Sequence, residues 1–375
     1  MTIAITLSTG VAMLAAQASR PQVAEQPKGS SERLVATANG SSLGVAKFSR
    51  KIEPQFMITA KGGAFPADAL ERVKRVKGVT GADLVYGNKA KLGDKWVGVF
   101  GVDPSTFRNF TPDRTAKSND LWQNIAAGDV AVSFVLHSDG GVKLRDQVSI
   151  AGTTHASQAR VGAYATMGVS GVDAVVSKTT AQRIGMTKDN VMLVGGKRKD
   201  LTKLKKALEK VLPKKAATVQ VLNPSFDFAG GSSGGAYLSA AEISRSINAG
   251  YTKIGWPYVW GGESDAEGGY DCSGLVQWAF AQAGIKMPRV AEDQARTGPW
   301  LPFAQAQPGD LLIWANDPSA PGRISHIAIY IGGNQMLVAP HTGDFVKIQK
   351  VYLTNFKGAV RVNRGAAAQL ARTLG

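Results

Sequence analysis

The most constraining feature of this 375-residue chain is its only cysteine, Cys272, which comes directly before an apolar segment with helical spacing. Apolar side chains recur there at intervals typical of one helix face, at Leu275, Val276, Ala279, Phe280 and Ala283. Cys272 therefore lies at the start of a helix, where unpaired backbone N–H groups and the helix dipole favour a thiolate. A lone cysteine is more often an inert buried side chain, but the polar, glycine-rich residues around Cys272 argue against a plain core element.

Composition and charge narrow the class of protein. One cysteine excludes an intrachain disulfide, and together with four histidines it leaves little material for a zinc site, so we expect no metal and no cofactor. The formal net charge of +16 predicts attraction to a polyanion such as nucleic acid, anionic lipid or an acidic cell-wall polymer. The lysine-rich strip 197–215 is either a polyanion-binding face or a solvated helix face. Because no aromatic residues are interleaved with these lysines, we expect no nucleic-acid partner.

The N-terminal residues predict export. Residues 3–16 are uncharged and largely apolar, and Ala16-Gln17-Ala18 has the small-x-small pattern of a signal-peptidase site. The apolar run is shorter than the roughly 20 residues that span a bilayer. We therefore interpret residues 1–18 as a signal peptide or membrane anchor segment and 19–32 as a polar tether, with a buried core element as the alternative. The expected location is secreted or extracytoplasmic, with or without a membrane tether.

A change of composition near residue 226 predicts two folded domains. Residues 226–236 are rich in Gly and Ser, which is typical of a linker between domains. The residues before it, 33–225, read as a mixed α/β accessory domain. Its β-branched segments predict strands at 57–60, 97–102, 129–135, 147–152, 173–177, 191–196 and 218–222. Helices are predicted at 66–77, 119–126, 179–185 and 200–212. Residues 95–195 also show a weak resemblance to the extracytoplasmic domain of FtsX/MacB-type permeases, which implies an accessory role outside the cytoplasm.

The C-terminal residues 237–375 place a histidine on a sheet beyond the cysteine helix. The segment HIAIYI alternates, with Ile327, Ile329 and Ile331 on one face and His326 on the other. Gly332-Gly333-Asn334 predicts a hairpin to the next strand, QMLVAP. A cysteine at a helix start and a histidine on an adjacent sheet are the usual components of a thiolate–imidazolium pair. A satisfied, half-buried histidine is the alternative.

Four ordered blocks carry a specific resemblance: PYVWGG, YDCSGLVQWAF, QPGDLLIW and ISHIAIYIGGNQM. Residues 238–362 resemble the NlpC/P60 family of papain-like cysteine peptidases. The resemblance implies an α+β fold in which helices, one of them carrying the nucleophile, pack on a small antiparallel sheet carrying the base. It also implies hydrolysis of amide bonds in peptidoglycan stem peptides, commonly between D-glutamate and the diamino acid.

The resemblance assigns roles to particular residues. Cys272 becomes the nucleophile, His326 the general base, and Tyr258 a group that helps to bind the oxyanion. The family's third, orienting residue falls at Val338, which cannot orient an imidazole; His341 is the nearby candidate, and a backbone carbonyl is the alternative. Asp271 and Ser273 flank the sulfur, either as substrate-binding residues or as a helix cap.

The leading hypothesis is therefore a peptidoglycan endopeptidase whose partners are peptidoglycan and, through the accessory domain, anionic wall polymers or an envelope protein complex. An amidase at the sugar–peptide bond or a transpeptidase would use the same thiol chemistry. A non-catalytic cell-wall binding or scaffold protein is the alternative from another class, and Val338 at the orienting position keeps it open.

Overall fold

The computed structural model describes residues 35–36, 44–197, 201–212, 216–222 and 236–374. The predicted signal or anchor segment, the tether and almost all of the Gly/Ser linker lie outside these residues. Residues Leu34–Gly375 form one compact unit. Among the described residues, none of the helices has the length and apolar content needed to cross a membrane. We call the described residues up to 222 the N-terminal lobe and residues 236–374 the C-terminal lobe; their division into two domains stays a prediction.

A nine-stranded sheet organises the N-terminal lobe, in the order β3-β7-β4-β6-β5-β2-β8-β1-β9. Its strands are β1 (Pro54–Ala60), β2 (Val79–Leu92), β3 (Lys95–Val102), β4 (Val130–Ser133), β5 (Gln147–Ala151), β6 (Ala156–Ala165), β7 (Ala174–Ser177), β8 (Val191–Gly196) and β9 (Ala217–Val221). An additional pairing joins β2 to β3 and closes β2 through β7 into a ring. Strand β2 belongs both to this ring and to the rest of the sheet, because its first half pairs with β8 and its second half with β3.

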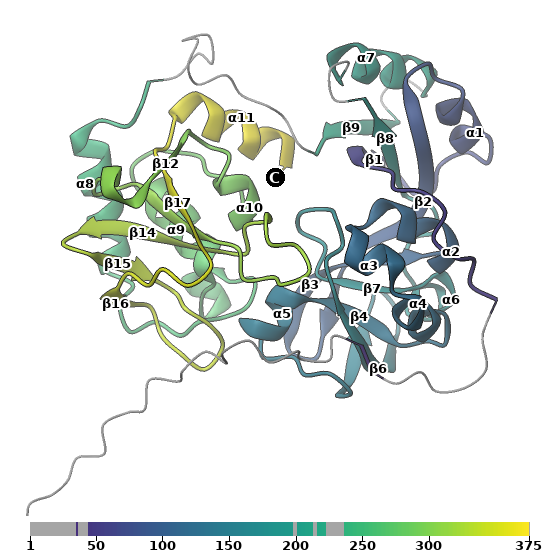
Figure 1. The fold of residues 1–375 in the computed structure, drawn as a ribbon, viewed down its shortest axis with the longest axis horizontal. Helices are drawn as coiled ribbons and strands as arrows, with labels where there is room; N and C mark the ends of the chain where they lie inside the picture. Colours follow the sequence, from purple (N-terminus) through teal and green to yellow (C-terminus); the bar gives the residue numbers. More distant parts are fainter. Residues whose placement is uncertain (1–34, 37–43, 198–200, 213–215, 223–235, 375) are drawn as a thin grey trace, which may run out of the picture. The chain divides into compact units, whose positions relative to one another are not determined.

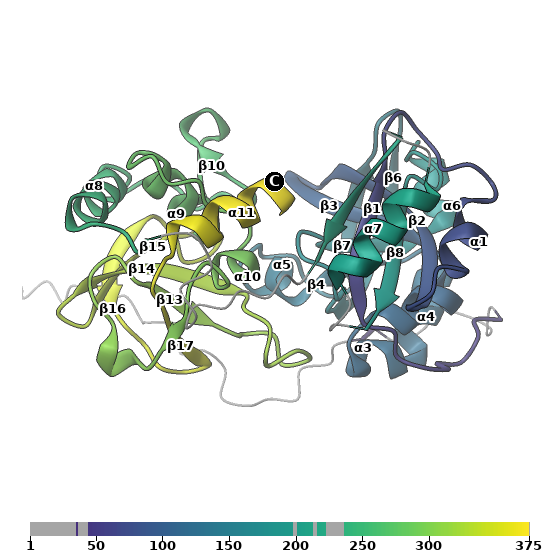
Figure 2. The ribbon, with the colours of Figure 1, turned by 90° about the horizontal axis from the view of Figure 1, so that it is seen from above.

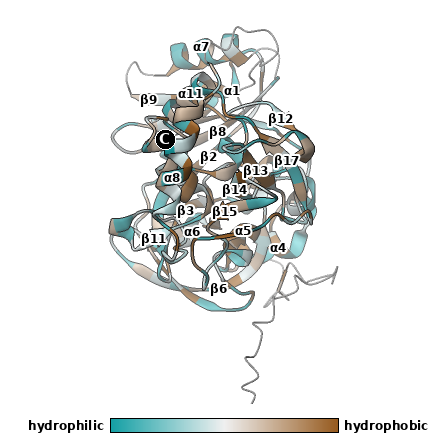
Figure 3. Cartoon of the chain, turned by 90° about the vertical axis from the view of Figure 1, so that its left-hand side faces the viewer, coloured by the Kyte–Doolittle hydropathy of each residue, from teal (hydrophilic) through white to brown (hydrophobic). Residues whose placement is uncertain are grey.

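Helices cover this sheet. They are α1 (Ala69–Lys74), α2 (Pro104–Phe107), α3 (Asp113–Lys117), α4 (Asn119–Ala126), α5 (Phe134–Ser138), α6 (Lys178–Arg183) and α7 (Leu201–Val211), with a 3-10 turn η1 (Arg108–Phe110). Helix α7 lies across β1 and β8 (Figure 2), with Leu204 and Leu208 in one apolar cluster with Phe56 and Val194. Apolar and polar residues are interspersed along α7 (Figure 3). Its leucines face the sheet and its lysines face solvent, as in an amphipathic helix.

One expectation for this lobe needs correction, and two of its strands were not predicted. The predicted strand 129–135 ends at Ser133, because the Ser133 hydroxyl accepts a hydrogen bond from the Leu136 N–H at 3.1 Å and starts helix α5. Strands β2 and β6 were not predicted. Polar residues and glycines interrupt the apolar pattern of β2, although the strand is held by partners on both sides. The other predicted strands and helices of this lobe are confirmed within a few residues.

In the C-terminal lobe, a six-stranded antiparallel sheet has the order β12-β17-β13-β14-β15-β16. Figure 1 labels all of these strands except β13, which is labelled in Figure 2. Its strands are β12 (Trp300–Leu301), β13 (Leu311–Trp314), β14 (His326–Gly332), β15 (Gln335–Val338), β16 (Lys347–Lys350) and β17 (Phe356–Val360). The helices are α8 (Ala240–Tyr251), α9 (Cys272–Ala281), α10 (Ala291–Gln294) and α11 (Arg364–Leu374), and β10 (Glu263–Ser264) pairs with β11 (Gly269–Tyr270). The predicted hairpin of β14 and β15 is confirmed.

Two apolar layers hold the C-terminal sheet. One face packs against α9, where Leu275, Val276 and Phe280 meet Ile327 and Ile329. The other face carries a smaller cluster that includes Trp314, Ala328 and Val338. The helix that begins with Cys272 is thus fixed against the strand that begins with His326. This arrangement confirms the predicted α+β architecture, with helices packed on a small antiparallel sheet.

Candidate active site

The backbone around Cys272 fixes the start of helix α9. The Asp271 carboxylate caps the helix by accepting from the Gly274 N–H at 2.7 Å, and the Leu275 N–H donates to the Asp271 carbonyl at 2.9 Å. The N–H groups of Cys272 and Ser273 precede these bonded groups, at the end of the helix where partial positive charge accumulates. Gly274 also allows a close approach of the loop, since a Cβ there would lie 2.0 Å from the Gly262 carbonyl oxygen.

His326 opens β14 and lies beside the sulfur. It pairs with Trp314 across the sheet, and the two rings are 5.7 Å apart. The side-chain donor atoms of His326, Cys272 and Asp139 all lie within 4.8 Å of one another. The Asp139 Oδ2 is 3.5 Å from the His326 Nδ1. Only 6% of Cys272 and 3% of His326 is exposed. The structure therefore brings the predicted nucleophile and base together; their catalytic roles stay predictions.

The surroundings of His326 favour its protonated form. Burial of the ring lowers the pKa of His326, but the neighbouring Tyr352, Asp139 and Cys272 outweigh it, and the pKa lies well above its usual range. An imidazolium beside a sulfur is the charge state needed to stabilise a thiolate and later to protonate a leaving amine.

Tyr258 lies close to the same centre. Its backbone N–H donates to the Asp344 carbonyl at 2.8 Å, and its chain runs beside Tyr270, two residues before the cysteine. Burial, together with the negative charges of Asp139, Cys272 and Asp271, raises the pKa of Tyr258 well above its usual value. Tyr258 therefore keeps its phenolic proton, which an oxyanion-binding donor requires.

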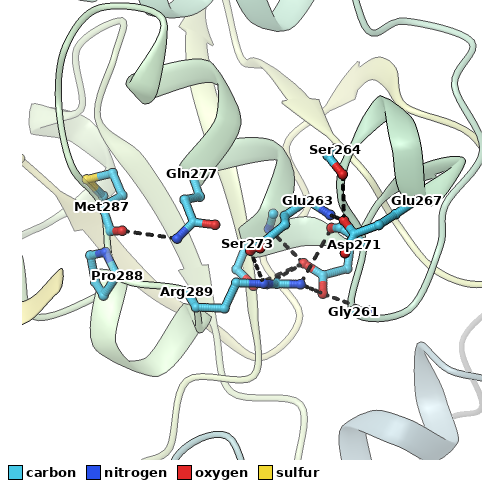
Figure 4. A network of polar contacts seen from close by, with 12 residues as sticks. Gly261, Glu263, Ser264, Glu267, Asp271, Ser273, Gln277, Met287, Pro288 and Arg289 are labelled. Carbon is cyan, nitrogen blue, oxygen red and sulfur yellow. Dashed lines mark hydrogen bonds and ion pairs between the residues drawn. The ribbon is translucent and has the colours of Figure 1, made fainter. Parts of the chain in front are cut away.

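Arg289 links the two residues that flank the cysteine (Figure 4). Its terminal nitrogens donate to both carboxylate oxygens of Asp271, at 3.0 and 2.7 Å, and also to the Ser273 hydroxyl at 3.0 Å. Its Nε lies 2.8 Å from the Glu263 carboxylate. Burial lowers the pKa of Arg289, but the ion pair with Asp271 more than compensates and raises it overall. Asp271 and Ser273 are thus engaged in capping and in this network, and their predicted substrate contacts stay untested.

The contacts of His341, the predicted orienting residue, are with its own loop, and its role stays a prediction. Its side chain is half exposed and lies 3.8 Å from the Asp344 carboxylate, and its Nδ1 is 3.0 Å from the Thr342 carbonyl oxygen. Val338, at the family's usual orienting position, is fully buried in the apolar cluster with Trp314. Neither residue has, among the described contacts, a hydrogen bond to His326.

Sequence reasoning missed three residues near the pair: Asp139, Arg289 and Tyr352. No periodic pattern or motif around Asp139 signals a contact with His326, because the two belong to different lobes. Arg289 follows a proline in a loop, where an arginine is commonplace. A thiolate, an imidazole and a carboxylate are also the donors that zinc prefers. Since two of these three groups form the Cys–His pair, we assign them to thiol chemistry.

Comparison with known proteins agrees with the geometry. The family model described as "NlpC/P60 family" matches residues 255–364. The Gamma-D-glutamyl-L-lysine dipeptidyl-peptidase of Bacillus subtilis (strain 168) is 40% identical over 102 residues, covering 27% of this chain and 33% of the relative. The Peptidoglycan endopeptidase RipA of Mycolicibacterium smegmatis is 36% identical, covering 29% of this chain and 23% of the relative. This chain thus spans a third or less of the length of these relatives.

One solved structure is similar to about a third of this chain. The P60 domain of the M. avium paratuberculosis antigen MAP1272c is 31% identical, with a TM-score of 0.28, and the match covers 32% of this chain and 93% of that chain. The resemblance of residues 95–195 to FtsX/MacB-type permeases has no support from these comparisons and stays a prediction. The sequence blocks, the cysteine helix packed on the sheet and the matched family model agree: residues 255–364 of this chain are an NlpC/P60 family domain.

Proposed function

We propose that this protein is a cysteine peptidase that hydrolyses amide bonds in the stem peptides of peptidoglycan. The observation that carries the proposal is the buried pair of Cys272, at the first turn of α9, and His326, with their donor atoms within 4.8 Å. A relative named as a peptidoglycan endopeptidase and one named as a gamma-D-glutamyl-L-lysine dipeptidyl-peptidase support the substrate class. The proposed bond joins D-glutamate to the diamino acid, and the proposed location is the extracytoplasmic cell wall, where the positive net charge favours retention.

The mechanism begins with proton transfer from Cys272 to His326. The thiolate attacks the carbonyl carbon of the scissile amide, and the resulting oxyanion is bound by backbone N–H groups at the start of α9 and by the Tyr258 hydroxyl. His326, as an imidazolium, protonates the leaving amine, so that the C–N bond breaks and a thioester remains on Cys272.

Hydrolysis of the thioester completes the cycle. The now neutral His326 removes a proton from water, and the hydroxide attacks the thioester carbonyl. The C–S bond breaks, the acid product leaves and releases its remaining proton to solvent as it becomes a carboxylate, and the thiolate–imidazolium pair is restored.

Digestion of purified peptidoglycan by the full chain tests the proposal. We expect stem-peptide fragments to be released by the wild-type chain and not by Cys272→Ala, and mass spectrometry should find a new carboxylate on D-glutamate and a new amine on the diamino acid. New ends at the sugar–peptide bond would instead identify an amidase. Absence of any Cys272-dependent product, both from the wild-type chain and from its Asp139→Asn variant, would contradict the proposal and favour a binding protein.

A further inference from the structure

Asp139 reaches the catalytic pair from the N-terminal lobe. It directly follows helix α5, is 6% exposed, and holds its Oδ2 3.5 Å from the His326 Nδ1. This oxygen is buried and has no hydrogen-bond partner among the residues that the structure describes, whereas the other carboxylate oxygen accepts from the Ser138 hydroxyl at 2.7 Å. A buried carboxylate oxygen of this kind is costly unless a nearby charge compensates it. The imidazolium of His326 is that charge.

The position of Asp139 differs from that of an orienting residue. In a Cys–His–Asp triad the nucleophile and the carboxylate contact opposite ring nitrogens, and two hydrogen bonds of about 3 Å would separate them by roughly 6 Å or more. Here the carboxylate and the sulfur lie within 4.8 Å of each other as well as of the ring. Asp139 therefore lies on the cysteine side of His326, in the space that a scissile carbonyl must enter. A carboxylate there also opposes the thiolate, since like charges repel.

The contacts around Asp139 hold this arrangement in place. The Thr342 N–H donates to the Asp139 carbonyl at 2.6 Å. Gly140 lies so close to the Trp260 ring that a Cβ would come within 3.0 Å of it. Trp260, two residues after Tyr258, packs against the apolar cluster of the N-terminal lobe that contains Leu136.

A second set of contacts between the lobes lies near Thr166. The Thr166 hydroxyl bonds to the Asp317 carboxylate and to the Ser319 hydroxyl, the latter at 2.7 Å. Arg114 donates to the Pro318 carbonyl at 2.8 Å. The two sets join the N-terminal lobe to the lobe that carries the site, with Asp139 directly beside Cys272 and His326. In the chain with these contacts made, 6% of Cys272, 3% of His326 and 6% of Tyr258 is exposed. While these contacts hold, the space beside the sulfur is closed to a stem peptide, so release by the wild-type chain comes from molecules in which the lobes have separated.

We propose that the N-terminal lobe inhibits the peptidase by covering its active site. The Asp139 carboxylate then occupies the position that the new carboxylate of the cleaved substrate takes after hydrolysis. The inference rests on the proposed function for the identity of the substrate. Hydrolysis then requires the lobes to separate at the Asp139 and Thr166 contacts, and whatever binds the N-terminal lobe at this face activates the enzyme.

A disulfide between the lobes tests the closure directly. The hydroxyls of Thr166 and Ser319 are 2.7 Å apart, so cysteines at these two positions carry their sulfurs close together, and Thr166→Cys combined with Ser319→Cys is oxidised to give a reversible link, which mass spectrometry verifies. The readout is the rate at which iodoacetamide alkylates Cys272 in the full chain, measured by mass spectrometry of its peptide. We expect the oxidised double variant to react at least ten-fold more slowly than the wild type, and reduction to restore the rate. Each single variant, oxidised in the same way, is the control.

Equal alkylation rates in the oxidised double variant and the wild type would overturn the proposal, because Cys272 would then be reachable with the lobes linked. Asp139→Asn gives an independent measurement. We expect it to raise both the alkylation rate and the release of stem peptides several-fold, while Asp120→Asn, an exposed residue of the same lobe, changes neither. A loss of both in Asp139→Asn would show that Asp139 assists catalysis, and would also overturn the proposal. If the alkylation rate falls on oxidation and recovers on reduction, but neither the oxidised nor the reduced protein cleaves peptidoglycan, the inhibition by closure is supported and the proposed function is contradicted.

Discussion

Arg289 and Asp271 form a two-pronged ion pair directly beneath the first turn of the cysteine helix, with N–O distances of 3.0 and 2.7 Å. The same carboxylate accepts from the Gly274 N–H at 2.7 Å and from the Gly261 N–H at 3.0 Å. The Asp271 side chain thus joins the start of α9 to the loop at Gly261, and Arg289 holds the Asp271 side chain in its orientation. The positive charge of Arg289 also lies near enough to Cys272 to interact with it.

Replacing Arg289 with lysine should weaken both the fold and the activity. A lysine keeps the charge but cannot bind both oxygens of Asp271 and also Glu263, because its ammonium lacks the planar fork. We expect a loss of about 2 kcal/mol in the free energy of unfolding and a roughly ten-fold lower rate of stem-peptide release. Urea unfolding and peptidoglycan digestion measure the two effects. Arg75→Lys, at an exposed position, is the matched control and should change neither; an unchanged rate in Arg289→Lys would show that the pair is only structural.

The two histidines of the C-terminal sheet region should respond very differently to substitution. His326→Ala removes the base and the imidazolium, and should lower the rate at least about a thousand-fold. His341→Ala should retain the wild-type rate within about three-fold, because its contacts are with Asp344 and Thr342. Both variants are compared in the same digestion assay, with thermal unfolding to confirm that they fold. A large loss in His341→Ala would restore it as the orienting residue.

Tyr258→Phe isolates the contribution of the phenolic proton. Because the raised pKa keeps this hydroxyl protonated, its removal takes one donor from the developing oxyanion. We expect kcat to fall roughly ten- to hundred-fold with little change in KM, as is usual for one oxyanion donor. Alkylation of Cys272 by iodoacetamide, which builds no oxyanion, should proceed at the wild-type rate. A parallel loss of alkylation would show that the hydroxyl acts on the thiolate instead.

The sequence was sufficient to predict the parts of the site that depend on local pattern. The apolar spacing after Cys272 predicted α9, and the alternation of HIAIYI predicted β14, so the cysteine and the histidine were placed on the correct elements. Resemblance to one family supplied the pairing of the two. The antiparallel hairpin followed from the glycines and asparagine at 332–334, which favour positive φ.

Contacts between distant segments could not be predicted in this way. His341 was chosen because it is close to Val338 in sequence, but its side chain points to Asp344. Asp139 follows a short helix whose first two residues, Phe134 and Val135, were expected to end a strand, and its contact with His326 depends on how two lobes pack. Strand β2 was missed because tertiary pairing on both sides overrides its mixed composition.

Gly274→Ala should disturb the active site without removing a catalytic group. The new Cβ would lie 2.0 Å from the Gly262 carbonyl oxygen, which accepts from the Asp271 N–H at 2.9 Å. The loop must move away from the helix, and the cap, the oxyanion donors and Tyr258 move with it. We expect a loss of roughly a hundred-fold in rate and of about 2 kcal/mol in stability. Gly322→Ala, where a Cβ meets nothing within 4 Å, is the control and should behave as the wild type.

Asp293 should make the stability of the protein fall as the pH rises. The residue is 1% exposed, its Oδ1 has no hydrogen-bond partner within the described part of the chain, and an Arg296 side-chain nitrogen is 3.9 Å from it. Burial raises the pKa of Asp293 to about 7, and Arg296 only partly offsets it. An unfolded chain loses this proton near pH 4. Between these pH values the folded state binds a proton that the unfolded state has lost, so stability is full below about pH 4 and declines until about pH 7.

Asp293→Asn removes this dependence, since an amide resembles the protonated acid and does not titrate. The gain in unfolding free energy over the wild type should be small at pH 4.5 and reach on the order of 2–4 kcal/mol at pH 7.5. Urea unfolding at a series of pH values measures the gain, with Asp120→Asn as an exposed control that should show none. A gain that is constant from pH 4.5 to 7.5 would mean that Asp293 is already ionised at the lower pH, paired closely enough with Arg296 to overcome its burial.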